Sequence, residues 1–284
     1  MSTGIGDAVK RKEDKRFTTG KGKYTDDVRN DNQAYAAFVR SPHAHARVTG
    51  IDASAALAMD GVIDVLNGAQ LTGDGIGNII CGWAVTSKDG SPMNMGAWSA
   101  LATEKVRYVG DAVAVVIAET QALARIAAEA VEVSYEQLSV AASIAAAMEA
   151  DAPEIHENAP GNLIYDWEIG DEAATDAGLA GAAHVTTLDV INNRLSPNPM
   201  EPRSAVATYD DSEEQYKLYT TSQNPHVARL VLSAFYNVAP EHKLRVIAPD
   251  VGGGLGAKIY TYPEETTCLG AAMRTNAWAN WTSA

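Results

Sequence analysis

Apolar and polar positions alternate along the first half of the chain in short runs that predict strands separated by helices. The expected strands are Ala34–Val39, Val62–Leu66, Val106–Val109, Ala112–Ile117 and Val131–Tyr135. Two helices are expected between strands, one from its cap at Asp52 to Met59 and one from its cap at Thr120 to Ala130. Both helices carry small and apolar residues at helical spacing, which favours packing against a sheet.

The second half predicts a similar mixture after a segment rich in turn-forming residues. Asp151–Gly161 holds two prolines and a glycine among polar residues, which is typical of a boundary. We therefore expect a first domain over 1–140, a linker over 141–160 and a second domain over 161–284. The further elements expected are a helix from Asp171, strands at Val185–Val190, Ala205–Tyr209 and Gln215–Thr221, and a helix that Asn224 caps and Pro225 begins. The fold class is α+β.

Composition excludes several classes of function. The chain has 284 residues and a formal net charge of −14, so its surface repels nucleic acid and anionic membranes. No run approaches the length of a membrane span, and no signal peptide is visible, so a cytoplasmic location is expected. Cys81 and Cys268 are expected to be small buried residues and not a disulfide. An iron–sulfur cluster takes about four cysteines, so this chain is expected to carry none.

A glycine-rich loop near the end of the chain is the main candidate site. The sequence Asp250-Val-Gly-Gly-Gly-Leu-Gly-Ala-Lys258 follows the strand-like run Leu244–Ala248. Glycine allows positive φ and close approach of another group to the backbone. Such a loop can offer bare N–H groups to an anionic or oxo-bearing ligand. The alternative is a turn without a ligand.

The glycine loop does not fit the common nucleotide-binding patterns. Gly252, Gly254 and Ala257 spell G-x-G-x-x-A, but a dinucleotide fold needs a helix that begins inside the glycines. Here Lys258–Tyr262 predicts extended chain, and the next helix is expected only at Pro263. A phosphate loop is excluded as well, since an alanine precedes the lysine and no serine or threonine follows it.

Gln223 is expected to form a second wall of the same site. It follows a strand-like run and directly precedes the helix at Asn224. Its amide can donate to a partially negative oxygen without adding charge. We predict that Gln223 lies within about a ligand's width of Gly254 and Gly256.

Two other pairs of polar residues favour structural roles. Glu201 and Arg203 lie in a proline-rich loop and could act as a catalytic pair, although such pairs are more often structural. His43 and His45 would share one face of a strand, but a third metal ligand is not apparent, so no metal site is expected.

A series of segments in a specific order carries a resemblance to a known family. The segments are Arg11–Phe17, Gly20–Asp27, Ala37–Ala46, Val106–Val113, Pro199–Arg203, Ser222–His226 and Val246–Gly254. In these segments the chain resembles the N-terminal part of the molybdenum-binding large subunit of the xanthine oxidase family, in the style of aerobic carbon monoxide dehydrogenase large chains.

The resemblance implies an α/β hammerhead domain followed by the first part of a molybdopterin-binding domain. It implies oxidative hydroxylation of a small substrate with water as the oxygen source, at molybdenum held by molybdopterin, expected as the cytosine dinucleotide. In the family, a glutamine at this position hydrogen-bonds the apical oxo ligand, and the glycine-loop backbone lies beside the oxo group and the pterin. The implied cofactor-binding residues are Gln223, Gly252, Gly253, Gly254, Leu255 and Gly256.

The resemblance also implies partners and shows departures. Electrons are expected to pass to an iron–sulfur small subunit and an FAD-binding medium subunit. Leu255 replaces the phenylalanine of the family, and Ile259 replaces the glutamate of purine-oxidising members, which argues against purines. The catalytic glutamate is expected beyond Ala284, so a remaining large-subunit segment is a further expected partner and no catalytic residue is expected here. The alternative is a non-catalytic remnant or assembly module that kept the fold.

Overall fold

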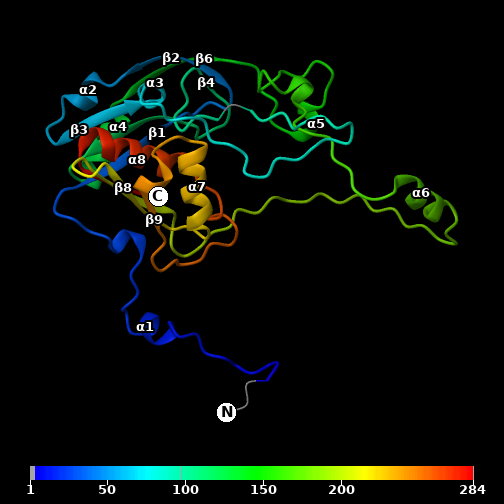
Figure 1. Ribbon diagram of the computed structural model, residues 1–284. Coiled ribbons are helices and arrows are strands. Elements are labelled where there is room, and N and C mark those ends of the chain that lie inside the picture. The colour runs from blue at the N-terminus through cyan, green and yellow to red at the C-terminus, as the bar shows by residue number, and fades with distance from the viewer. Residues whose placement is uncertain (1–3, 97, 284) are drawn as a thin grey trace.

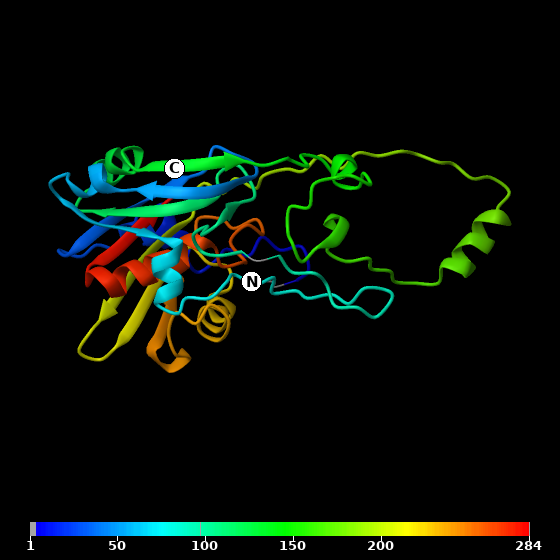
Figure 2. The ribbon, with the colours of Figure 1, turned by 90° about the horizontal axis from the view of Figure 1, so that it is seen from above.

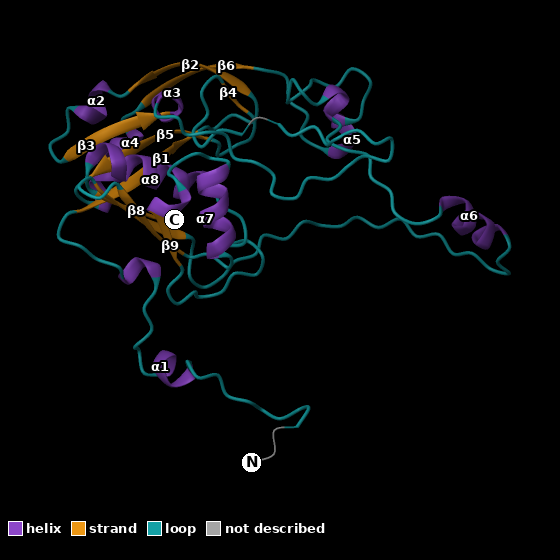
Figure 3. Cartoon of the chain, in the orientation of Figure 1, coloured by secondary structure: helices purple, strands orange, loops and turns teal. Residues whose placement is uncertain are grey.

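A mixed sheet forms the centre of the molecule (Figures 1 and 3). The computed structural model describes residues 4–96 and 98–283. Within these residues the sheet has seven strands in the spatial order β3 (Val62–Asn67), β5 (Ala112–Ala118), β1 (Gln33–Arg40), β10 (Trp278–Thr282), β7 (Ser204–Asp210), β8 (Gln215–Thr220) and β9 (Leu244–Ile247). The pairs β1–β10 and β8–β9 are parallel, and the other pairs are antiparallel.

A second, antiparallel sheet lies above the first in Figure 1, with the order β4 (Lys105–Val106), β2 (Ala46–Asp52) and β6 (Glu132–Gln137). The α-helices are α1 (Asp14–Thr18), α2 (Ser54–Leu57), α3 (Gly68–Gly73), α4 (Gln121–Glu129), α5 (Ile144–Ala147), α6 (Glu172–Ala180), α7 (Pro225–Ala234) and α8 (Pro263–Thr275). Short 3-10 turns form at Thr25–Asp27, Pro160–Asn162 and Glu241–Lys243. Within 4–96 and 98–283, the helices are too short or too polar to cross a bilayer.

Strand β5 is buried on both faces, as its continuous apolar sequence predicts. Val115 and Ile117 face the core cluster that includes Leu269 of α8. Ala114 and Val116 face the opposite cluster, which α2 and α4 cover. The central sheet therefore lies between two helical layers, and the α+β fold class is confirmed.

The helices next to the candidate site begin where proline predicts. Pro225 is the first residue of α7, and Pro263 is the first residue of α8. The side chain of Asn224 does not cap α7 as expected; instead the Asn224 N–H donates to Ser222 Oγ at 2.9 Å. Lys258–Tyr262 is not a continuous extended segment either, because Lys258 ends a turn that begins in the glycine loop.

One expected strand is absent from the described structure. Residues 165–198 are exposed throughout and project from the body around α6, as both ribbon views show (Figures 1 and 2). Val185–Val190 has strand-like sequence but pairs with no described segment, so the prediction of a strand there is wrong for this structure. A strand is stabilised by its ladder and by burial of one face, and here both are missing.

The two predicted domains share the central sheet. β1, β3 and β5 come from residues 1–140, whereas β7 to β10 come from 161–284. The linker over 141–160 contains α5, and a 3-10 turn begins at its last residue, Pro160. The division into 1–140, 141–160 and 161–284 stays a prediction.

Candidate functional site

The glycine loop and Gln223 lie together beyond the carboxyl ends of two neighbouring parallel strands. β8 ends at Thr220 and leads to Gln223, while β9 ends at Ile247 and leads to the loop. The Gln223 N–H donates to Lys258 O at 2.8 Å. Gln223 Oε1 accepts from the N–H groups of Gly256 at 3.0 Å and of Lys258 at 3.3 Å. The structure therefore has the proximity that the sequence predicts, at the edge of a sheet where ligands commonly bind.

These contacts set the orientation of the Gln223 amide. Both partners of its side-chain oxygen are N–H donors, so the carbonyl must face them and the NH2 group must point elsewhere. No acceptor in the described part of the chain engages that NH2 group. Gln223 thus offers a neutral, pre-oriented hydrogen-bond donor.

The glycines are required by the packing and backbone angles of the loop itself. A Cβ on Gly254 would overlap the amide carbon of Gln223, and a Cβ on Gly252 would lie 2.5 Å from a side-chain carbon of the neighbouring proline-rich loop. Gly253 and Gly256 have φ of +97° and +87°, which residues with a side chain rarely adopt. The sequence predicts that another group comes close to the backbone of this loop. At Gly252 and Gly254 that group is a side chain of the same chain, Glu201 and Gln223 respectively.

The loop offers fewer bare donors than its sequence suggests. The N–H of Gly252 donates to Glu201 Oε2 at 2.6 Å, and the N–H of Gly256 is held by Gln223. Three consecutive N–H groups have no acceptor among the described residues, those of Gly253, Gly254 and Leu255. Among the glycines of the loop, the N–H groups of Gly253 and Gly254 are therefore free to contact a ligand, together with that of Leu255.

Glu201 and Arg203 have separate partners, so the structure does not join them as a catalytic pair. Glu201 Oε2 lies 3.2 Å from Lys258 Nζ, and the Arg203 guanidinium lies 3.7 Å from the Glu264 carboxylate. Arg203 also lies over the ring of Tyr262. The contact between Glu201 and Lys258 has no signal in the local sequence.

Two acidic side chains are buried in the first turn of α8. Glu264 lies 2.6 Å from Arg40, and Glu265 accepts a hydrogen bond from Thr220 Oγ1 at 3.1 Å. Burial raises the pKa of Glu265 to about 7, although the nearby Arg203 opposes the rise. The helix N-terminus favours negative charge, but desolvation dominates for Glu265. A buried group that titrates near neutrality therefore lies beside the strand that leads to Gln223.

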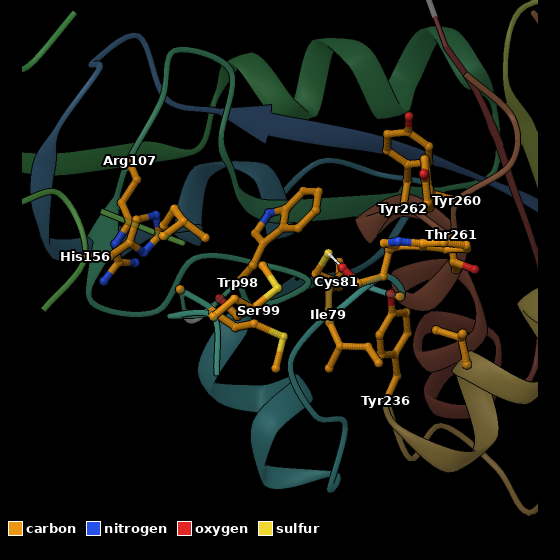
Figure 4. Close-up of a pocket in the computed structure, with 18 of the residues that line it drawn as sticks. Ile79, Cys81, Trp98, Ser99, Arg107, His156, Tyr236, Tyr260, Thr261 and Tyr262 are labelled. Atoms are coloured by element: carbon orange, nitrogen blue, oxygen red, sulfur yellow. Dashed lines mark hydrogen bonds between the residues drawn. The ribbon is translucent and has the colours of Figure 1, made fainter. Parts of the chain in front are cut away.

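An apolar cavity of about 910 Å³ adjoins the site through Asn224 and Ile259, the neighbours in sequence of Gln223 and Lys258. Figure 4 shows Trp98 between a tyrosine-rich end, with Tyr236 and Tyr260, and an end with Arg107 and His156. Sequence reasoning missed this cavity, because its aromatic residues lie in segments without regular periodicity. Clustered aromatic and apolar lining suits an uncharged organic group.

The remaining candidates have structural surroundings. The ring of His43 packs edge-on against Tyr135 at 4.9 Å, and His45 Nδ1 hydrogen-bonds a backbone carbonyl at 2.7 Å. Cys81 and Cys268 are both free, as predicted. Cys268 is buried as expected, but Cys81 is exposed at the edge of the cavity, which corrects the prediction that both are buried.

Comparison with known proteins places these features in a family. Residues 19–139 match the family described as aldehyde oxidase and xanthine dehydrogenase, a/b hammerhead domain. Residues 155–284 match the molybdopterin cofactor-binding domain. The chain belongs to the molybdenum hydroxylase large-subunit family. The predicted order of a hammerhead domain followed by a molybdopterin-binding domain is confirmed.

Curated members of this family are similar along nearly the whole chain. The carbon monoxide dehydrogenase large chain of Afipia carboxidovorans is 38% identical, over 98% of this chain and 34% of that protein. The nicotine 6-hydroxylase large subunit of Paenarthrobacter nicotinovorans is 36% identical, over 92% of this chain and 31% of that protein. The chain therefore spans about a third of the length of these relatives.

Solved structures show the same fold along nearly the whole chain. The Cu,Mo-CO dehydrogenase in its carbon monoxide reduced state matches with a TM-score of 0.85 and 36% identity, over 99% of this chain and 35% of that chain. The quinoline 2-oxidoreductase from Pseudomonas putida 86 matches with a TM-score of 0.83 and 33% identity, over 99% of this chain and 34% of that chain.

Proposed function

We propose that this chain supplies one wall of the active site of a molybdenum hydroxylase that oxidatively hydroxylates a small substrate with oxygen from water. The observation that carries the proposal is the donor set beyond β8 and β9. It consists of the Gln223 NH2 group and the free N–H groups of Gly253, Gly254 and Leu255. Neutral donors of this kind suit an oxygen atom that bears partial negative charge.

These residues fit molybdenum bound to molybdopterin, for which we propose the cytosine dinucleotide form. Gln223 would hold an oxo group through its NH2, and Gly253 to Leu255 would hold oxo and pterin acceptors through the backbone. Of the loop positions predicted for the cofactor, Gly252 and Gly256 instead hold Glu201 and Gln223 through their N–H groups. The bound group supplies the two-electron redox chemistry of hydroxylation. The chain contributes orientation and charge-neutral donors.

The remaining machinery is proposed to lie on other sequence. Glu201, the carboxylate on this wall, is held by Lys258 and Gly252, so a general base is expected from a further large-subunit segment. The exposed apolar residues of 165–198 support a docking partner for this segment. We propose that electrons leave to an iron–sulfur small subunit and an FAD-binding medium subunit, in the cytoplasm.

The substrate is proposed to be small and uncharged, and not a purine. Ile259, which replaces a glutamate of purine-oxidising members, lines the apolar cavity next to the donor set. An aliphatic side chain cannot exchange hydrogen bonds with the polar edge of a purine. The aromatic lining from Trp98 and Tyr260 supports the same choice.

Gln223→Glu tests the proposal in the assembled enzyme. A carboxylate keeps an acceptor for Gly256 and Lys258 but turns a second acceptor, in place of a donor, toward the ligand. Turnover is expected to fall about 100-fold or more, whereas molybdenum content falls much less. Gln137→Glu, on the exposed side of β6, is the matched control. Unchanged turnover in Gln223→Glu would contradict the assigned role.

A non-catalytic assembly module is the second candidate function. It is favoured by the state of Glu201, the carboxylate on this wall, which is held by Lys258 and Gly252 and is not free to act as a base. Molybdenum analysis by mass spectrometry on protein purified from its native host separates the two. About one molybdenum per chain, in a complex with the partner subunits, supports the hydroxylase. A stable complex without molybdenum supports the assembly module.

A further inference from the structure

Lys258 is a charged residue with no exposed side-chain surface. Its side chain is 0% exposed, and its ammonium group is held by Glu201 alone among the described residues. Nζ donates to Glu201 O at 2.8 Å and to Glu201 Oε2 at 3.2 Å. A buried ammonium group is tolerated only with such partners, because its desolvation costs several kcal/mol. The position of Lys258 is thus tied to the position of Glu201.

Glu201 in turn holds the first glycine of the loop, Gly252, at two points. The Gly252 N–H donates to Glu201 Oε2 at 2.6 Å, and the Glu201 N–H donates to Gly252 O at 3.2 Å. A side chain on Gly252 would collide with Glu201. The entry to the loop is therefore clasped by the same carboxylate that holds the buried ammonium group.

The backbone of Lys258 holds Gln223 at the other end of the loop. Lys258 O accepts from the Gln223 N–H at 2.8 Å, and the Lys258 N–H donates to Gln223 Oε1 at 3.3 Å. Gln223 Oε1 also accepts from Gly256. One residue thus connects both ends of the loop, through its side chain to Gly252 and through its backbone to Gln223.

We propose that Glu201 and Lys258 form a clamp that fixes the central N–H groups of the glycine loop and aims the Gln223 NH2 group. Both are positioning residues, since they act on a ligand only through the loop and Gln223. The clamp is a property of the 284-residue chain by itself. Its consequence for catalysis rests on the proposed function.

Hydrogen–deuterium exchange on the 284-residue chain tests the clamp directly. Lys258→Met leaves the Glu201 carboxylate without its counter-charge. Glu201→Gln leaves the Lys258 ammonium group without its counter-charge, but it keeps a side-chain oxygen that can accept a hydrogen bond from the Gly252 N–H. Peptides covering 252–256 are expected to exchange roughly tenfold or more faster in each variant, because charge-assisted hydrogen bonds are lost. Lys88→Met is the matched control, since it breaks an exposed pair with Asp166.

The double variant Glu201→Gln/Lys258→Met gives a second readout. It removes both charges together, so its loop is expected to exchange more slowly than in Lys258→Met alone, because no uncompensated buried charge remains. If circular dichroism shows that Lys258→Met does not fold, the exchange rates of Glu201→Gln and of the double variant test the clamp instead. A folded Glu201→Gln variant whose residues 252–256 exchange at the wild-type rate would overturn the clamp.

In the assembled enzyme, a positioning role predicts a specific kinetic pattern. Glu201→Gln is expected to lower kcat at least tenfold per bound molybdenum, with a much smaller change in KM. An unchanged kcat per bound molybdenum, with a fall in molybdenum content alone, would overturn positioning in favour of simple retention of the cofactor. A wild type that binds no molybdenum would refute the proposed function and leave the exchange result on the clamp intact.

Discussion

Replacing Gly254 by alanine would force a methyl group into the space that the Gln223 side chain occupies. The three atoms nearest to a Cβ at this position are Cδ, Oε1 and Cγ of Gln223, all well inside van der Waals contact. Gly254 does not have positive φ, so alanine is compatible with its backbone conformation. The expected effect is therefore steric and acts on one identified neighbour.

Two routes of relaxation set the magnitude of the Gly254→Ala effect. If Gln223 stays, overpacking costs about 1–3 kcal/mol. If Gln223 moves, its oxygen loses the hydrogen bonds from Gly256 and Lys258, each of which contributes about 0.5–1.5 kcal/mol. The routes are alternatives, so the free energy of unfolding is expected to fall by about 1–3 kcal/mol.

Urea unfolding, followed by circular dichroism, measures this change. Gly73→Ala is the matched control, because a Cβ at Gly73 meets nothing within 4 Å and its φ is not positive. In a Gln223→Ala background the obstructing side chain is gone. Gly254→Ala is therefore expected to lower the free energy of unfolding much less in that background than in the wild type. Exchange of the Gly256 and Lys258 amides should rise in Gly254→Ala if Gln223 moves.

Two results would refute the reasoning about Gly254. The first is a Gly254→Ala chain that unfolds at the wild-type urea midpoint with an unchanged slope. The second is an equal loss in the free energy of unfolding when Gly254→Ala is made in the wild-type and in the Gln223→Ala backgrounds. That result would show that Gln223 is not the neighbour that excludes a side chain at Gly254.

The remaining predictions concern the buried carboxyl group of Glu265 and the two cysteine thiols, of which Cys268 is buried and Cys81 is exposed. The pKa of Glu265 is raised to about 7, above its ordinary value of 4.5, so its contribution to stability is present below pH 4.5 and lost as pH rises through 7. Wild-type chain should lose about 3 kcal/mol over this window relative to Glu265→Gln, measured by urea unfolding at several pH values, and parallel pH profiles would contradict this. Iodoacetamide at pH 8 should label the exposed Cys81 in the native chain, and Cys268 only after denaturation. The reason is that Cys268 is buried and that burial raises the pKa of its thiol. Peptide mass spectrometry locates the label, and labelling of both cysteines in the native chain would contradict the prediction.

Local sequence was sufficient for most elements and for the proximity of Gln223 to the glycine loop. The start of α7 at Pro225, the start of α8 at Pro263 and the buried strand β5 follow from proline geometry and apolar patterning over a few residues. The meeting of Gln223 with the glycine loop was also predictable, since each follows a strand-like run. These properties depend on conformational preferences that act within a short stretch of chain.

Only the tertiary structure decided the features that depend on distant partners. Sequence-local reasoning missed the ion pair between Glu201 and Lys258 and placed Cys81 in the core, whereas Cys81 is exposed. Val185–Val190 has strand-forming residues but no strand to pair with among the described residues. Ladder pairing, burial and charge compensation are each contributed by groups far away in sequence, so residue type at one position cannot determine them.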